Sequence, residues 1–181
     1  YPLVIPVLGL GVIIILIIGI LNGEKLAITA EQKLYKDPII YTKTTQYQRI
    51  VFTESHNGNL YCYINGNLQF SSLDERIYHE FLVHPVLATA QSRKNILVLG
   101  GGDGLAVREI LKYNDVQTVT LVDIDPEMTH LAKTFPRLTQ LNNNSLNTGK
   151  VSVLNSGGVS KGEKVKLHQV GQGFFVVNFN L

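Results

Sequence analysis

Residues 95–125 read NILVLGGGDGLAVREILKYNDVQTVTLVDID, and this stretch decides the fold. Asn95 to Leu99 is a short apolar run, as expected of a strand that is buried on both faces of a parallel sheet. A glycine-rich turn, Gly100 to Gly104, follows directly, and the spacing of Leu105 to Tyr113 predicts a helix. A strand, a glycine turn and a helix begin a Rossmann-like unit, in which the glycines allow a tight turn and a close approach of a ligand to the backbone.

The second predicted strand of this unit ends in an acid. Thr118 to Val122 has strand character, and Asp123 follows it, 20 residues beyond Asp103. An acid at this separation can accept hydrogen bonds from the two ribose hydroxyls of a nucleoside. Asp125-Pro126-Glu127 then opens another helix, with proline at an early helical position. The sequence therefore predicts a nucleoside site, and the alternative is a glycine-rich turn that only packs.

The glycine spacing indicates which nucleoside. A dinucleotide-binding turn needs a third glycine at position 105, which is Leu105 here, so NAD is disfavoured. The turn instead resembles the loop of methyltransferase-type domains, which bind S-adenosylmethionine and its relatives. The carboxylate of Asp103 would repel a pyrophosphate and attract a cationic sulfonium or amine.

The chain begins with a long apolar segment. Residues 1–21 carry no charged side chain, and about 20 apolar residues are enough for a helix to cross a bilayer. We expect a transmembrane helix over residues 1–22, ended by Asn22-Gly23; a signal-like segment and a buried core helix are the alternatives. The basic residues that follow predict a location at the cell membrane with the soluble part facing the cytoplasm. These residues are Lys25, Lys33, Lys36 and Lys43.

Residues 23–90 are expected to hold a linker, a small β-meander and a helix. Two Asn-Gly pairs, at 57–58 and 65–66, predict hairpin turns between three short strands. These strands are Gln48 to Thr53, Leu60 to Ile64 and Leu68 to Phe70. A meander of this size is too small to be stable alone, so we expect it to pack on the rest of the chain.

A helix is expected to start at Leu73, because Ser72 and Glu75 have the spacing of a capping box. Ile77, Phe81 and Leu82 place an apolar stripe on one of its faces, and Pro85 could stop or kink it. The same helix carries His79 and His84, which lack the partners that a metal site needs.

Composition narrows the classes of protein further. The 181 residues allow one ordinary domain and a small accessory element. The net charge of +2 does not suggest nucleic acid as a partner. Cys62 is the single cysteine, which excludes an internal disulfide, and its position in a strand-like run indicates a small buried residue.

Several motifs together resemble the spermidine synthase (polyamine aminopropyltransferase) family, in the membrane-associated bacterial branch. They occur in the order of that family, from about residue 1 to about residue 155. The motifs are Tyr47 to Ile50, Asn65 to Gln69, Tyr78-His79-Glu80, Gly100 to Gly104 and Leu121 to Asp125.

The resemblance implies transfer of an aminopropyl group from decarboxylated S-adenosylmethionine to putrescine, which gives spermidine and methylthioadenosine. It implies decarboxylated S-adenosylmethionine as a co-substrate, no bound cofactor and no metal. Gln48 would contact the nucleoside product and Asp123 its ribose, while His79 and Asp103 would contact the polyamine and the aminopropyl chain. Gln69 and Tyr78 would line the same cleft, beside the turn that contains Gly100, Gly102 and Gly104.

The chain departs from the family after residue 154. The family has an acid beside the adenine where this chain reads Asn155-Ser156-Gly157-Gly158, and no acid follows Glu163. Residues 174–180 have strand character, with Asn178 where the family's proton-accepting acid is expected, and an amide cannot accept that proton. No residue is therefore predicted as the catalytic base.

The expected fold class is α/β. A Rossmann-like, methyltransferase-type parallel sheet over residues 91–181, incomplete at its end, forms a partial nucleoside-binding domain after the meander and the transmembrane helix. A non-catalytic membrane-bound homologue or fragment, and an S-adenosylmethionine-dependent methyltransferase, are the alternative functions. The sequence leaves a homo-oligomer open.

Overall fold

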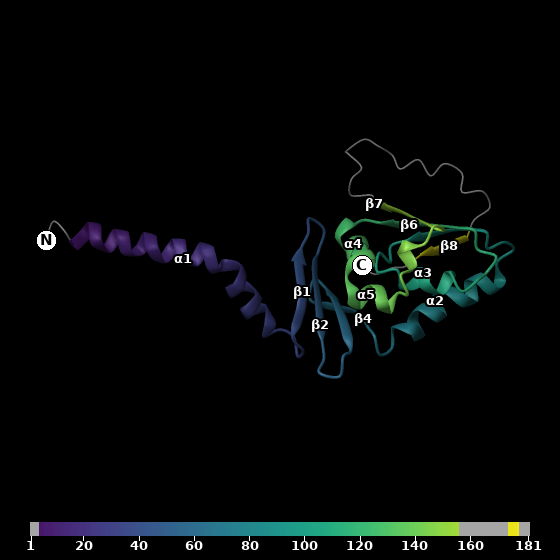
Figure 1. Ribbon diagram of the computed structural model, residues 1–181, viewed down its shortest axis with the longest axis horizontal. Helices are drawn as coiled ribbons and strands as arrows, with labels where there is room; N and C mark the ends of the chain where they lie inside the picture. The colour runs from purple at the N-terminus through teal and green to yellow at the C-terminus, as the bar shows by residue number, and fades with distance from the viewer. Residues whose placement is uncertain (1–3, 156–173, 178–181) are drawn as a thin grey trace.

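The computed structural model describes residues 4–155 and 174–177 and has a helix followed by two sheets (Figure 1). The first helix, α1 (Val4–Gln32), projects away from the rest of the molecule. An antiparallel sheet comes next, and a parallel sheet with its helices completes the described chain. The predictions for residues 156–158, Glu163 and Asn178 lie outside the described residues.

The first helix is longer than the sequence predicts. The helix does not end at Asn22-Gly23 but continues to Gln32, because neither residue prevents helical geometry and good helix formers such as Ala27 and Ala30 follow. Within the part of the chain that the structure describes, no helix combines the length and the apolar character required to cross a membrane. The transmembrane helix expected over residues 1–22 is therefore not supported.

The antiparallel sheet has one strand more than expected. Its strands pair in chain order, with tight turns after the second and third. They are β1 (Ile39–Thr44), β2 (Arg49–Glu54), β3 (Leu60–Ile64) and β4 (Asn67–Ser71). The two predicted Asn-Gly turns are present, with Gly58 at φ 78° and Asn65-Gly66 at φ 51° and 81°. The strand β1, which was assigned to the linker, pairs with β2.

The next helix, α2 (Glu75–Thr89), begins two residues later than expected and without the capping box. The Ser72 hydroxyl instead accepts a hydrogen bond from the Leu60 backbone N–H at 3.0 Å, which closes the sheet. Pro85 lies inside the helix and does not stop it. Ile77 and Phe81, on the predicted apolar stripe, are 63% and 77% exposed, so this helix buries a different face.

The parallel sheet confirms the α/β prediction. Its order is β7-β6-β5-β8, with all pairs parallel. The strands are β5 (Asn95–Leu99), β6 (Thr118–Asp123), β7 (Val151–Asn155) and β8 (Phe174–Val177). Between them lie α3 (Leu105–Ile110), α4 (Pro126–Thr134), α5 (Pro136–Leu141) and a short 3-10 turn, η1 (Ser145–Asn147). The strand order reverses beside β5, and ligands of open α/β sheets bind at this point, beyond the carboxyl ends of the strands.

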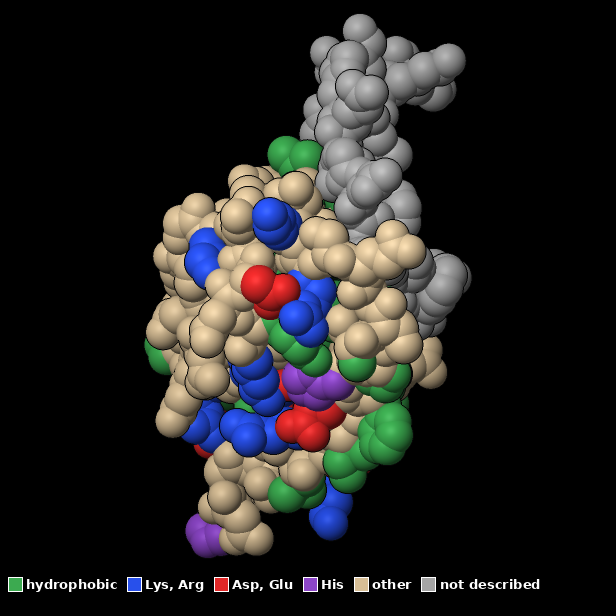
Figure 2. Space-filling view, turned by 90° about the vertical axis from the view of Figure 1, so that its right-hand side faces the viewer, with side chains coloured by type: hydrophobic (Ala, Val, Ile, Leu, Met, Phe, Trp, Pro, Cys, Tyr) green, Lys and Arg blue, Asp and Glu red, His purple; other side chains and the backbone are tan. Residues whose placement is uncertain are grey.

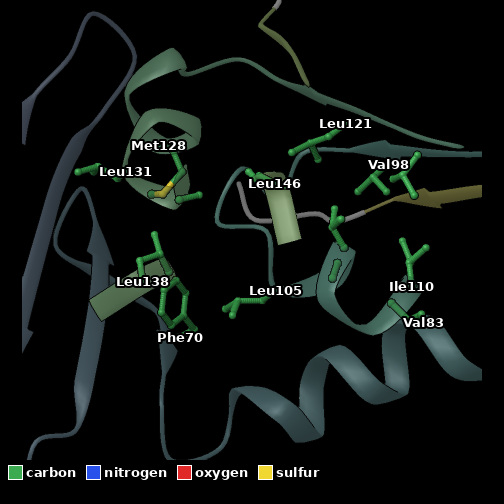
Figure 3. Close-up of a cluster of buried hydrophobic side chains, with 14 of the residues drawn as sticks. Phe70, Val83, Val98, Leu105, Ile110, Leu121, Met128, Leu131, Leu138 and Leu146 are labelled. Atoms are coloured by element: carbon green, nitrogen blue, oxygen red, sulfur yellow. The ribbon is translucent and has the colours of Figure 1, made fainter. Parts of the chain in front are cut away.

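One hydrophobic core joins the two sheets (Figure 3). Phe70 of the meander lies across from Leu138 of α5 and Leu105 of α3, and Phe52 contacts the Phe135 ring with centroids 5.4 Å apart. Polar contacts add to this junction, since the Tyr41 hydroxyl donates to the Glu127 carboxylate at 2.6 Å. The meander therefore packs on the α/β unit, as its small size required.

Candidate nucleoside and amine site

The glycine turn after β5 forms the floor of the candidate site. Gly100, Gly101 and Gly104 have φ of 77°, 72° and 80°, a left-handed conformation that only glycine adopts without strain. The Asp103 carboxylate accepts a hydrogen bond from the Leu105 backbone N–H at 2.8 Å and is 5% exposed. The turn thus holds an acid at the start of α3, next to the carboxyl end of the central strand.

The predicted ribose acid packs directly on this turn. The Asp123 carboxylate accepts hydrogen bonds from the backbone N–H groups of Gly102 and Asp125, both at 2.8 Å. A Cβ atom on Gly102 would lie 2.7 Å from an Asp123 oxygen, so this position requires glycine. Burial raises the pKa of Asp123; the two backbone hydrogen bonds oppose this, and the charges of Asp103 and Asp125 reinforce it, so the net pKa is above its ordinary value.

A cavity of about 470 Å³ opens between β4 and the first turns of α2. Three predicted residues, Gln69, Tyr78 and His79, line it together. The cavity is lined as well by Leu68, Phe70, Ser71, Asp74, Glu75 and Ile77. The structure therefore brings the three residues into one cleft.

His79 is the most enclosed of the cleft residues, at 1% exposed. Its Nδ1 lies 2.7 Å from the Glu75 carbonyl oxygen and 3.0 Å from the Glu75 carboxylate. Its Nε2 is buried and has no hydrogen-bond partner among the described residues. Burial lowers the pKa of His79, but the hydrogen bond from Nδ1 to Glu75 and the negative charges of Asp103 and Glu75 outweigh it, so the net pKa is raised.

Gln48 lies at the edge of the antiparallel sheet, in the bend before β2. Its backbone is held by Thr45, whose hydroxyl accepts from the Gln48 N–H at 3.1 Å and donates to the Asp125 carboxylate at 2.8 Å. The bend is therefore tied to the start of α4, two residues after Asp123. The structure thus brings the segment of Gln48 near the end of β6, and within the described chain no hydrogen bond joins Gln48 to Asp123.

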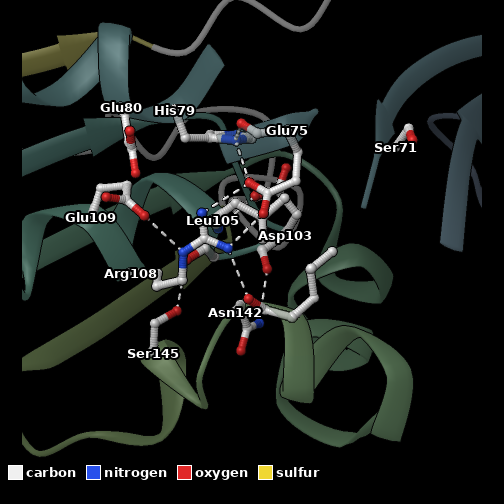
Figure 4. A network of polar contacts seen from close by, with 12 residues as sticks. Ser71, Glu75, His79, Glu80, Asp103, Leu105, Arg108, Glu109, Asn142 and Ser145 are labelled. Atoms are coloured by element: carbon white, nitrogen blue, oxygen red, sulfur yellow. Dashed lines mark hydrogen bonds and ion pairs between the residues drawn. The ribbon is translucent and has the colours of Figure 1, made fainter. Parts of the chain in front are cut away.

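Four residues that sequence reasoning did not assign to the site support it from behind (Figure 4). The Asn142 amide donates to the Asp103 carbonyl oxygen at 2.9 Å, and the Ser145 hydroxyl donates to the Gly104 carbonyl oxygen at 2.7 Å. Glu75 and Arg108 form a buried ion pair, with 2.7 Å between Oε1 and the guanidinium. In the sequence, the run Asn142-Asn143-Asn144 is the one pattern that could have pointed to these supporting residues. Asn143 and Asn144 adopt positive φ, which asparagine tolerates.

The outer face beyond α2 and α3 carries charges of both signs. Lys, Arg, Asp, Glu and His side chains lie next to one another in the view of Figure 2. Arg93 and Asp115 pair at 2.9 Å, and His84 lies 3.1 Å from the Glu109 carboxylate. Among residues 4–155 and 174–177, no group of His, Cys, Asp or Glu is arranged to hold a metal ion.

The glycine turn, the acid at the end of β6 and the strand order β7-β6-β5-β8 define an α/β domain with an open parallel sheet. The model of the spermine/spermidine synthase domain matches residues 75–177. The chain belongs to the spermine/spermidine synthase family, as the resemblance predicted.

The proteins that are similar in sequence or structure carry names from this family. The polyamine aminopropyltransferase of Oceanobacillus iheyensis is 48% identical over 80% of this chain and 28% of its own length. Polyamine aminopropyltransferase 1 of Streptomyces coelicolor is 49% identical over 74% of this chain and 26% of its own length. The crystal structure of spermidine synthase from Thermotoga maritima has a TM-score of 0.60 and 27% identity, over 65% of this chain and 40% of that one. The chain thus spans under a third of the length of these curated relatives.

Proposed function

We propose that this chain is the nucleoside- and amine-binding part of a polyamine aminopropyltransferase. The whole enzyme would transfer an aminopropyl group from decarboxylated S-adenosylmethionine to putrescine. The putrescine nitrogen forms a bond to the methylene carbon beside the sulfonium, and the carbon–sulfur bond breaks. Its electron pair stays on sulfur, which gives neutral methylthioadenosine, and the new ammonium loses its proton to give spermidine.

The observation that carries this proposal is the convergence of two acids and a histidine at the reversal point of the parallel sheet. Asp103 and Asp123 are buried there, at 5% and 9% exposed, and the negative charge of Asp103 contributes to the raised pKa of His79. Buried carboxylates with backbone hydrogen bonds suit cationic and hydroxyl-bearing ligands, because an anion would add a further repulsive charge. A sulfonium nucleoside and a diamine have this combination of groups.

Each site residue is assigned to the nucleoside or to the amine by its position in the structure. Asp123 keeps lone pairs free beyond its two backbone contacts, and these can accept from ribose hydroxyls. Asp103 and the cleft of Gln69, Tyr78 and His79 would hold the aminopropyl chain and the polyamine. Gln48 would contact the nucleoside from the meander side. The residue that removes the proton is not assigned, because the family's acid falls at Asn178, outside the described residues.

Calorimetric titration of the full chain in mild detergent tests the nucleoside site. We expect saturable binding of methylthioadenosine that is tighter than that of S-adenosylmethionine or NAD. Asp123→Asn should weaken it by about tenfold or more, because hydrogen bonds to a charged acceptor contribute about 1.5–3 kcal/mol. Asp115→Asn, at an exposed acid in the turn between α3 and β6, is the matched control and should leave the affinity unchanged. A folded sample that does not bind methylthioadenosine would refute the proposal.

A non-catalytic homologue is the second candidate, and one observation favours it. β7 ends in Asn155 rather than an acid, in register with Asp123, and the Asn155 amide donates to the Thr129 hydroxyl at 3.1 Å. Binding of methylthioadenosine and putrescine without spermidine formation from decarboxylated S-adenosylmethionine would support this candidate. A methyltransferase would instead bind S-adenosylmethionine more tightly than methylthioadenosine.

A location at the cell membrane, with residues 23–181 facing the cytoplasm, is a separate proposal. It is supported by the surface of α1, on which large apolar side chains from Val7 to Leu21 are exposed, because such a surface is favourable next to lipid or another apolar surface. Fractionation of cells that express the full chain should place it with the membranes, and Ile14→Lys with Ile17→Lys should release it. Recovery of the unaltered chain in the soluble fraction would refute this proposal. A homo-oligomer stays a prediction.

A further inference from the structure

Glu75 is a buried acid whose position is fixed by an arginine. It is 2% exposed, and Arg108 donates two hydrogen bonds to it, at 2.7 Å to Oε1 and 2.9 Å to Oε2. Arg108 is held in turn by the Glu109 carboxylate at 2.9 Å and the Leu141 carbonyl oxygen at 2.8 Å (Figure 4). Such a fork-to-carboxylate contact fixes both the plane and the position of the acid.

The fixed acid determines which nitrogen of His79 carries a proton. Nδ1 faces the Glu75 carbonyl oxygen at 2.7 Å and Oε2 at 3.0 Å. Burial raises the pKa of the Glu75 carboxyl, but its contacts with His79 and Arg108 outweigh this, and the net pKa is below its ordinary value. Glu75 is therefore a carboxylate, and both its carbonyl oxygen and its carboxylate oxygens can only accept a hydrogen bond. Nδ1 must therefore be the protonated nitrogen, and in the neutral ring Nε2 has a free lone pair.

Within the described residues, no hydrogen-bond donor contacts that lone pair. A buried polar atom without a partner is costly, and native structures seldom retain one without a reason. His79 lines the cleft with Gln69 and Tyr78, and Asp103 acts on its ring from the turn before α3. The groups that face the ring are thus Glu75 and the Tyr78 ring on α2 and Asp103 on the turn, with Arg108 of α3 behind Glu75.

We propose that Glu75, clamped by Arg108, is the positioning residue that keeps Nδ1 of His79 protonated and presents Nε2 as a hydrogen-bond acceptor for an ammonium group of the amine substrate. The ammonium then lies between a neutral acceptor and the negative Asp103. A protonated ring would present a donor and a positive charge instead, so binding of the amine requires the neutral ring. This inference rests on the proposed function only for the identity of the ligand as an amine.

The arrangement of Glu75 and His79 predicts how the affinity for the amine depends on pH. The negative Glu75 stabilises the imidazolium and raises the pKa of His79, and the amine, with a pKa of about 10, stays protonated over the range in which His79 titrates. Affinity for the amine should therefore increase as the pH rises through the pKa of His79. In Glu75→Gln the imidazolium loses its nearest negative partner, so the increase should move to lower pH.

Nitrogen-detected NMR of the full chain, labelled with ¹⁵N-histidine in mild detergent, tests the positioning role. His79→Gln assigns the resonances. We expect the neutral ring of the unaltered chain to carry its proton on Nδ1, and the titration midpoint of Glu75→Gln to fall by about one pH unit, as for the loss of one nearby opposite charge. Glu109→Gln removes another partner of Arg108 without touching His79, so its midpoint should equal that of the unaltered chain.

Titration with putrescine as a function of pH separates this inference from the proposed function. A rise in affinity that shifts with the His79 midpoint in Glu75→Gln supports both. If putrescine does not bind at any pH, the proposed function fails, while the tautomer still decides the role of Glu75. A neutral ring protonated on Nε2, or a midpoint that Glu75→Gln does not move, overturns the inference. The tautomer is measured in the unaltered chain, so a variant that fails to fold does not remove the test.

Discussion

Gly102 and Asp123 show how a single missing side chain positions a charge. The Gly102 N–H donates to the Asp123 carboxylate at 2.8 Å, and the space in which a Cβ would lie is occupied by that same carboxylate. The glycine is therefore needed for the protein's own contact between turn and strand, before any ligand binds. This contact holds the acid of β6 against the turn that follows β5, where a nucleoside would lie across both.

Gly102→Ala should destabilise the fold and weaken nucleoside binding together. The new methyl group would displace the Asp123 carboxylate, since the contact of 2.7 Å is shorter than real Cβ atoms show. We expect a loss of about 1–3 kcal/mol in the free energy of unfolding, the usual cost of overpacking. Chemical unfolding measures it, and Gly149→Ala is the control, because nothing lies within 4 Å of a Cβ there. Equal stability of the two variants would show that the turn can move away.

At the scale of elements, the strands β5 and β6 of the parallel sheet were predictable, and the burial of α2 was not. Continuous apolar runs and an acid at a fixed separation placed β5 and β6, because local sequence suffices to define a buried strand and a turn. For α2, periodicity favoured the face of Ile77 and Phe81, whereas the structure buries Glu75, His79, Val83 and Leu87. The charge of Glu75 made that face look polar, and its partner Arg108 lies 33 residues away in the chain, a distance that no local pattern covers.

The two faces of α2 should differ sharply in their contribution to stability. Leu87 is fully buried and Phe81 is 77% exposed, on the same helix. We expect Leu87→Ala to lower the free energy of unfolding by about 2–5 kcal/mol. Phe81→Ala should change it by about 0.5 kcal/mol or less, as is usual for surface substitutions. Thermal and chemical unfolding measure both, and a large loss for Phe81→Ala would mean that this stripe is covered in solution.

At the scale of the whole molecule, the two sheets depend on one core. Phe52 of β2 is fully buried and contacts both Phe70 of β4 and Phe135 before α5, with centroids 6.3 Å and 5.4 Å apart. The need of the meander for a partner was predictable from its size, but the partner and the extra strand β1 were not. No glycine-containing turn like those after β2 and β3 marks Ile39–Thr44 as a separate strand. The pairing of this segment with β2 is decided by contacts across the sheet.

Because the core is shared, the meander and the parallel sheet should unfold as one unit. Hydrogen exchange of the full chain at increasing denaturant, followed by mass spectrometry, can compare peptides from β2–β3 with peptides from β5–β6. We expect both sets to lose protection at the same denaturant concentration, because neither sheet keeps its buried face covered without the other. Phe52→Ala should lower both midpoints together, because it should reduce the free energy of unfolding by about 3–5 kcal/mol. Loss of protection in β2–β3 at lower denaturant, with β5–β6 still protected, would mean that the α/β unit is stable alone and that the meander only docks on it.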